Sequence, residues 1–125
     1  MNPAERREAE RLQPMEVTFV TMRPDFSRTG KIRDISQGGL SFQYLARTDV
    51  GGVAKEIDVD MFISDNGYYL PSLPCRLVYD RRQAGVRATP SDLEYRVCGL
   101  QFGELSTGQS LQIGEYLQEH TVGKA

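Results

Sequence analysis

The sequence predicts a mostly β protein: a six-stranded antiparallel β-barrel with a C-terminal α-helix and a flexible N-terminal arm. Six runs of residues alternate between apolar and polar side chains, which is the period of a half-buried strand. Turn signals rich in Gly, Pro, Asn and Asp separate these runs at short spacing, and one helical segment follows the last run. In a chain of 125 residues this pattern favours one closed barrel over a sandwich.

The arm is expected to comprise residues 1–14 and the barrel domain residues 15–125. Asn2 can cap a helix with Pro3 in its first turn, but the residues as far as Gln13 have no continuous apolar face. A polar helix of about ten residues is marginal in water, because no packing offsets the cost of nucleation. We therefore expect the arm to be ordered mainly by what it contacts.

The six expected strands differ in how strongly their ends are marked. Asn66-Gly67 is a strong hairpin signal, and the strand that follows it contains Pro71 and Pro74. Because proline cannot donate a ladder hydrogen bond, the first half of that strand is expected at an edge or a bulge. The alternating runs are 15–20, 31–36, 40–45, 57–64, 68–80 and 95–102.

The closing helix is expected to begin near Ser106 and to end near His120. The imidazole of His120 is better interpreted as a cation near the helix C-terminus than as a catalytic base. The side chains expected on the buried face are Leu111, Ile113 or Gly114, and Leu117.

Composition indicates a globular domain in the cytoplasm. No apolar run approaches the roughly 20 residues that span a bilayer, and the charged N-terminus does not resemble a secretory signal. Cys75 and Cys98 are poorly spaced for a metal site or a disulfide framework, so we expect two reduced core thiols. No metal or cofactor is expected.

The charge pattern limits the class of ligand. The formal charge is −2, so no global positive field attracts nucleic acid, and any anion site must be local. Twelve of the 15 basic residues are arginine, whose planar fork suits phosphate oxygens and the O6/N7 edge of guanine. A simple surface preference for arginine explains the count equally well.

The motif DxSxxG occurs twice, as Asp25 to Gly30 and as Asp34 to Gly39. The first copy follows Pro24 where a hairpin must reverse, so turn chemistry explains it, with Gly30 allowing positive φ. The second copy begins inside a strand and leads into the next one. There Gly38 and Gly39 would let the backbone turn sharply and let a flat ligand approach it closely.

Two polar side chains of the second copy offer ligand chemistry. The carboxylate of Asp34 can accept hydrogen bonds from the N1–H and N2–H edge of a guanine, and Ser36 can donate to an oxygen. Arg7 and Arg11 are spaced four apart, so on a helical arm they would share a face and favour an anion between them. A solvated charged arm is the alternative.

With these motifs the chain resembles the PilZ family of cyclic di-GMP receptors. The resemblance rests on Arg7-x-x-x-Arg11, on Asp34-x-Ser36-x-x-Gly39, on a late strand over 95–102 and on the C-terminal helix. It implies a ligand on the outer barrel surface, with the arm folded over it.

The resemblance also implies roles for individual residues. Arg7 and Arg11 would hold phosphates and guanine O6/N7 edges, while Asp34 and Ser36 would take the other guanine edge. An extra arginine directly before the motif, here Arg6, implies cyclic di-GMP bound as a stacked dimer.

Other residues favour structural roles on the sequence alone, and no pattern indicates an enzyme. Tyr79 could stack on a base but is expected to be packed. Arg81, Arg82 and Arg87 could rim the site but are expected in a solvated loop. Two alternatives to a receptor remain: a PilZ-like protein-interaction module that binds no nucleotide, and a single-strand nucleic-acid barrel. The acidic balance argues against the latter.

Overall fold

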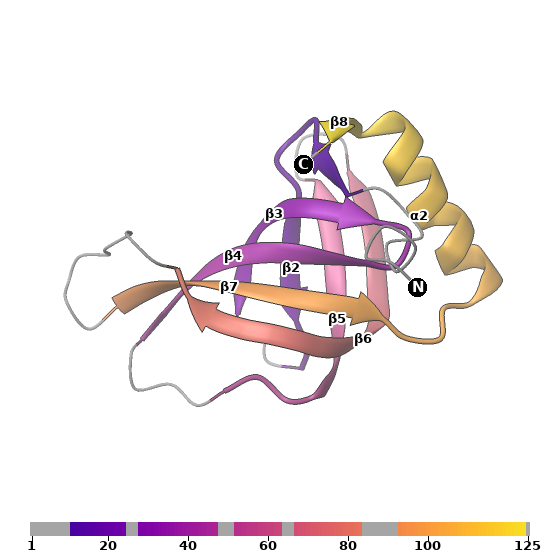
Figure 1. Cartoon of the computed structure of the whole chain (residues 1–125). Helices are drawn as coiled ribbons and strands as arrows, with labels where there is room; N and C mark the ends of the chain where they lie inside the picture. Colours follow the sequence, from indigo (N-terminus) through magenta and orange to yellow (C-terminus); the bar gives the residue numbers. More distant parts are fainter. Residues whose placement is uncertain (1–10, 25–27, 48–51, 64–66, 84–92, 125) are drawn as a thin grey trace, which may run out of the picture.

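A computed structural model describes residues 11–24, 28–47, 52–63, 67–83 and 93–124. Its centre is a closed barrel of six antiparallel strands in the order β2-β5-β6-β7-β4-β3, closed by pairing of β2 with β3 (Figure 1). The predicted six-stranded barrel with a C-terminal helix is thereby confirmed. The strands are β2 (Phe19–Met22), β3 (Thr29–Ser36), β4 (Gly39–Arg47), β5 (Glu56–Ile63), β6 (Tyr68–Arg82) and β7 (Leu93–Phe102).

The barrel interior is filled by the apolar residues of the alternating runs. Phe42, Val59 and Leu73 have no exposed surface, as expected for side chains that point inward from a half-buried strand. Cys75 and Cys98 are buried free thiols, and burial raises the pKa of each to about 12. The expectation of two core thiols is confirmed.

Two short strands extend the sheet beyond the barrel. β1 (Leu12–Pro14) pairs with β3 through Leu12 and Ile35, and with β8 (Thr121–Lys124) on its other side. Neither was predicted, because three or four residues are too few to show a period. The last residues of the expected arm are therefore a strand in this structure, and Figure 1 shows β1 and β8 side by side near the helix.

Helix α2 (Thr107–Glu119) packs across one end of the barrel (Figure 1). Ser106 caps it, with a reciprocal bond to Gln109 that completes a capping box. Ile113 and Tyr116 are fully buried, whereas Leu111 is 64% exposed, so its predicted burial is wrong. Leu111 lies two residues from Ile113, about 200° around a helix with 100° per residue, and so on the opposite face.

The proline-containing half of β6 behaves as predicted. Tyr68 to Pro74 pair only with β5, and pairing with β7 starts at Cys75. The register shifts between Val59 and Met61, where two residues of β6, Pro71 and Ser72, face the single residue Asp60, so the bulge lies in this half of β6. Prolines are therefore confined to the part of β6 that needs no donor on its second edge.

No helix in the described ranges is long and apolar enough to cross a bilayer.

Candidate functional site

The second DxSxxG copy forms the tight hairpin between β3 and β4. Ser36 pairs with Gly39, which leaves Gln37 and Gly38 as a two-residue connection. The Ser36 hydroxyl accepts a hydrogen bond from the Gly38 amide at 3.1 Å, and the Gly38 carbonyl accepts one from the Phe102 amide at 2.8 Å. The hairpin tip is thus fixed both by its own serine and by the end of β7.

A β-bulge places Asp34 on the outside of the barrel. The register between β3 and β4 shifts between Ile32 and Asp34, so Arg33 is the extra residue. Ile32 and Ile35 both point into the core, and the two residues between them point outward together. The spacing of three between these buried isoleucines is the sequence signal for the bulge, and sequence reasoning missed it.

Arg11 and Asp34 meet on this outer surface. Nε of Arg11 donates to Oδ1 of Asp34 at 2.6 Å, and Nη2 of the same guanidinium lies against the same oxygen. The two side chains are 32% and 25% exposed, so the pair is accessible from solvent. The structure therefore joins one residue from each of the two predicted motifs, although 23 positions separate them in the sequence.

The surface beside Asp34 is built from small residues. Asp34 pairs with Ser41 across β3 and β4, and Ser41 pairs with Gly99 across β4 and β7. A Cβ atom on Gly39 would overlap the carbonyl oxygen of Leu100, so this glycine is required by the close approach of β7. Gly39, Ser41 and Gly99 therefore form a strip of small, buried residues beside Asp34, which is called the small-residue floor.

The two adjacent glycines of the turn differ in their structural roles. Gly67 is the single glycine with positive φ among the described residues, so neither Gly38 nor Gly39 is needed for a left-handed backbone. A Cβ on Gly38 would meet nothing closer than the Ser36 hydroxyl, at 3.9 Å. Of the two adjacent glycines, only Gly39 has a steric requirement in the folded barrel.

The first DxSxxG copy is partly outside the described residues, which omit 25–27. Its Gly30 lies within β3, where a Cβ would overlap the carbonyl of Gln43. Gly30 has no positive φ, so the expected turn role is wrong and close strand packing explains this glycine. Arg6 and Arg7 also lie outside the described residues.

Tyr79, which was expected to be packed, and Arg81, which was expected in a solvated loop, border the same floor. Tyr79 pairs with Gly99, and a Cβ on Gly99 would overlap the tyrosine ring, so the ring lies directly over that glycine. The Arg81 guanidinium sits 4.7 Å from the centre of the ring. The sequence does not indicate that Tyr79 and Arg81 lie here, because their position depends on which residue of β7 pairs with Tyr79.

The expected loop position of the late arginines also needs correction. Arg81 and Arg82 belong to β6, where they pair with Val97 and Arg96 of β7. The strand continues past the predicted end because β7 is long enough to pair with it. Arg87 lies outside the described residues.

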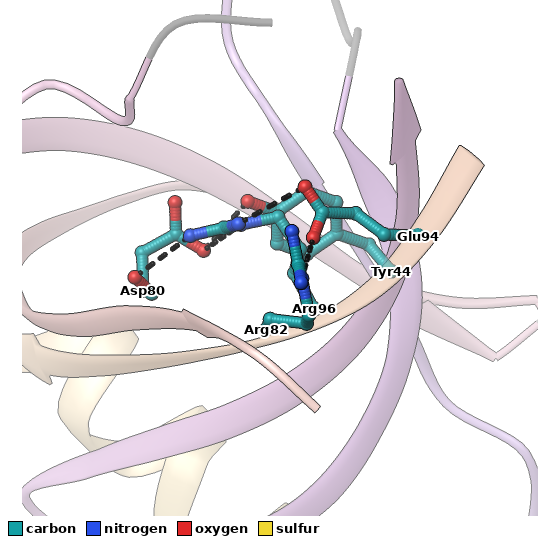
Figure 2. A network of polar contacts seen from close by, with 5 residues as sticks. All are labelled: Tyr44, Asp80, Arg82, Glu94 and Arg96. Carbon is teal, nitrogen blue, oxygen red and sulfur yellow. Dashed lines mark hydrogen bonds and ion pairs between the residues drawn. The ribbon is translucent and has the colours of Figure 1, made fainter. Parts of the chain in front are cut away.

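A polar network closes the barrel end away from α2, and Figure 2 shows its five residues together. Tyr44 donates to Asp80 at 2.7 Å, and Arg96 bridges Asp80 and Glu94 at 3.2 and 3.4 Å. Arg82 donates to Glu94 at 2.6 Å. These contacts join β4, β6 and β7 inside the barrel mouth.

The ionisation of this network follows from its contacts. Burial and the hydrogen bond to Asp80 raise the pKa of Tyr44 to about 12. The hydrogen bond from Arg82 holds the pKa of Glu94 below its ordinary value. Burial opposes the charge of Arg96, but its bond and attraction to Asp80 raise its pKa overall. Tyr44 therefore stays neutral and Glu94 stays ionised. This suits contacts that hold the strands together rather than proton transfer.

The described residues hold no cluster of three or more His, Cys, Asp or Glu side chains that would bind a metal ion. His120 is at the C-cap of α2, with Nδ1 3.0 Å from Oε1 of Glu16. Among the described residues, the best candidate site is therefore the outer surface at Asp34 and Arg11, where a carboxylate, a guanidinium and the small-residue floor could bind a flat polar ligand.

Comparisons with known proteins agree with this class of protein, a small β-barrel with a C-terminal helix. The family model of the PilZ domain matches residues 5–119. The chain belongs to the PilZ domain family. No curated protein matches it.

Among solved structures, the chain is similar to the PilZ domain with c-di-GMP of YcgR from Escherichia coli. The TM-score is 0.65 at 13% identity, over 90% of this chain and 89% of the other. At that identity the similarity establishes the shared fold.

Proposed function

We propose that this chain is a receptor for cyclic di-GMP and not an enzyme. The observation that carries the proposal is the contact between Arg11 and Asp34 on the outer barrel surface. It brings a guanidinium, which suits phosphate or the guanine O6/N7 edge, against a carboxylate that suits the guanine N1–H and N2–H edge. Membership of the PilZ family and the similarity to the YcgR domain, whose structure was solved with c-di-GMP, support the same ligand.

The ligand takes over contacts that the free protein makes to itself. Asp34 exchanges the guanidinium of Arg11 for a guanine edge, and Arg11 turns to a phosphate or a second guanine edge. Ser36, Gly38 and Gly39 provide the adjoining backbone, where the exposed hairpin tip leaves room for a base. Arg6 and Arg7 add the charge needed for a stacked dimer of the ligand.

The output is a change in the N-terminal arm that a downstream protein recognises. Arg11 is followed directly by β1, and β1 pairs with β8 next to the C-terminal end of α2. The amide of Met15 also donates to the carbonyl of His120 at 2.7 Å. A ligand that moves Arg11 therefore also displaces β1, which is hydrogen-bonded to β8.

Isothermal calorimetry with purified protein tests the receptor function. We expect wild-type protein to bind cyclic di-GMP and Asp34→Ala to bind about tenfold to a hundredfold more weakly, since a charge-assisted hydrogen bond contributes about 1.5–3 kcal/mol. Asp58→Ala is the matched control, because Asp58 is an exposed carboxylate on β5, which pairs with neither β3 nor β4. No heat at high micromolar ligand would instead favour a protein-interaction module that binds no nucleotide.

A further inference from the structure

Aromatic side chains gather on a different outer face of the barrel, over β2, β5 and the first half of β6. Phe19 on β2 pairs with Phe62 on β5, and Phe62 pairs with Tyr69 on β6. The rings of Phe19 and Phe62 stack with their centroids 5.5 Å apart and their planes at 25°. Neither phenylalanine belongs to the barrel core, so both rings lie on the outer surface. Phe19, Phe62 and Tyr69 are called the aromatic row.

The aromatic row is open to solvent. Tyr69 is 51% exposed, and Phe19 and Phe62 are partly exposed. Val17 lies two residues before Phe19, on the same outer face, and is 54% exposed. Isolated apolar side chains are ordinary on a protein surface, whereas a contiguous apolar patch marks an interaction site.

The exposed end of the row is held in place by a buried carboxylate. The Tyr69 hydroxyl donates to Oδ2 of Asp60 at 3.0 Å, and Nε of Arg23 donates to Oδ1 of Asp60 at 2.8 Å. Asp60 itself is only 3% exposed. Because the Tyr69 ring is already fixed by this bond, little side-chain freedom is lost when another molecule packs on it.

Two cations border the opposite end of the row. Lys31 on β3 pairs with Phe19, and Arg33 follows two positions later on the outside of the same strand. Since β2 and β3 are antiparallel, Arg33 lies level with Val17. Both cations are exposed, and neither forms an ion pair within the part of the chain that the structure describes. This face therefore combines an apolar row with two available positive charges.

We propose that the aromatic row, Val17 and the two cations form a docking surface for an acidic amphipathic helix of a partner protein. The apolar face of that helix packs on the rings, and acidic residues near one end pair with Lys31 and Arg33. Three steps of about 4.8 Å between strands make the row from Lys31 to Tyr69 about 14 Å long, which about ten helical residues cover. The inference goes beyond the proposed function, because it gives the downstream protein a place to bind.

Charge favours an acidic partner over a second copy of this chain. In a symmetric dimer two rows would face each other in opposite directions, so Lys31 of each copy would lie at the Tyr69 end of the other. The carboxylate beside Tyr69 is that of Asp60, which is buried and bound to Arg23. It is not available to Lys31 of a second copy, whereas a partner helix supplies its own carboxylates.

A membrane surface is also a poorer match than an acidic helix. The formal charge of the chain is −2, so the protein as a whole is not attracted to anionic lipids. Stable electrostatic attachment to such lipids uses clusters of about four to eight cations, and this face offers Lys31 and Arg33.

The first experiment selects displayed random peptides of about 16 residues, long enough for a helix of about 24 Å, for binding to the wild-type protein. We expect the enriched peptides to carry net negative charge and apolar residues at helical spacing. Enrichment of peptides that lack the negative charge or the spacing would contradict the proposal.

The second experiment measures the binding of the enriched peptides by fluorescence anisotropy. Val17→Ser should weaken binding about tenfold, because an apolar contact is lost. Val78→Ser is the matched control, since Val78 is a valine 62% exposed in the second half of β6, and it should leave the affinity within about twofold. Lys31→Glu should also weaken binding about tenfold, because attraction becomes repulsion. Its control is Lys55→Glu, a change at an exposed cation before β5.

Two measurements exclude the other occupants of this face. Wild-type protein should not bind vesicles of phosphatidylserine and phosphatidylcholine, and it should sediment as a monomer in analytical ultracentrifugation. Vesicle binding that Val17→Ser abolishes would make the face a membrane contact. A dimer that Val17→Ser dissociates would make it an interface between copies. Either result would overturn the proposal.

Calorimetry with cyclic di-GMP separates this inference from the receptor function. Val17→Ser should bind cyclic di-GMP with wild-type affinity, which also shows that the variant is folded. If wild-type protein binds cyclic di-GMP but the enriched peptides bind Val17→Ser and Lys31→Glu as well as wild type, the receptor function stands and the docking surface is wrong. If the two variants weaken peptide binding but no cyclic di-GMP binds, the docking surface stands and the receptor function is wrong.

Discussion

Nε of Arg11 donates to Oδ1 of Asp34 at 2.6 Å, so the two residues with the clearest ligand chemistry bind each other in the ligand-free protein. Both side chains are about a quarter to a third exposed. An exposed ion pair contributes about 0–1 kcal/mol, so a ligand can replace it at a cost of no more than about fivefold in affinity. The pair therefore orients the arginine without blocking the site.

Arg11→Ala separates binding from stability. We expect the free energy of unfolding to fall by less than about 1 kcal/mol, because the lost pair is partly exposed. Affinity for cyclic di-GMP should fall about tenfold to a hundredfold, because the charged hydrogen bonds to the ligand are lost. Urea denaturation and calorimetry measure the two effects. A large loss of stability with unchanged affinity would make Arg11 a structural residue.

The two adjacent glycines provide a matched pair of variants. Gly39→Ala should destabilise the barrel by about 1–3 kcal/mol, because its Cβ would overlap the Leu100 carbonyl and force β4 and β7 apart. Gly38→Ala should change stability by less than about 0.5 kcal/mol, because its Cβ meets only the Ser36 hydroxyl at 3.9 Å. Thermal unfolding of both variants gives the comparison, and equal melting temperatures would contradict it.

Much of the fold is predictable because its signals are local. Period-two alternation and turn residues identify all six barrel strands, and Asn66-Gly67 and Pro71 place the features of β6. Local patterns do not predict β1 and β8, because these strands depend on pairing between segments that are distant in the sequence. β1 pairs with β8 across more than 100 positions of sequence, and three residues carry too little pattern to predict it.

In the candidate site, too, motif residues are predictable from the sequence and residues placed by strand pairing are not. Asp34 and Arg11 are marked by motifs and their contact is present, whereas Tyr79 and Arg81 carry no motif. Their place beside the site depends on the register of β6 against β7, including a bulge between Leu77 and Tyr79. A bulge reverses which side chains face outward, so alternation alone does not assign these two residues to the outer face.

Tyr116→Phe tests the attachment of α2 to the barrel. The Tyr116 and Thr18 hydroxyls are 2.6 Å apart and fully buried, and burial raises the pKa of Tyr116 to about 12. Removing this hydroxyl should reduce the free energy of unfolding by about 1 kcal/mol, since Thr18 keeps its bond to the Glu16 carbonyl. Tyr95→Phe is the control, because the Tyr95 hydroxyl has no hydrogen bond to a described residue. Chemical denaturation showing equal stability of the two variants would contradict the prediction.

Asp60 should make stability depend on pH in acid. Its carboxylate accepts from Nε of Arg23 at 2.8 Å, from the Ser72 amide at 2.9 Å and from the Tyr69 hydroxyl at 3.0 Å. Burial by itself would raise the pKa of Asp60, but these hydrogen bonds outweigh it and hold the pKa below the ordinary value of 3.8. The ionised form is therefore the one that the folded state favours.

The direction of the pH effect follows from that shift. Because the pKa of Asp60 is lower in the folded than in the unfolded state, its contribution is complete above the unfolded value of 3.8 and is lost as pH falls through the folded value. Asp60→Asn should thus be less stable than wild type at pH 7, by about 2 kcal/mol for a buried acceptor of several hydrogen bonds. The difference should shrink below about pH 4.

Urea denaturation of both proteins between pH 7 and pH 3 measures this difference in stability. Asp58→Asn, a change at an exposed neighbour on β5, is the control at pH 7. A difference that stays constant down to pH 3 would show that the charge of Asp60 is not what stabilises the bulge.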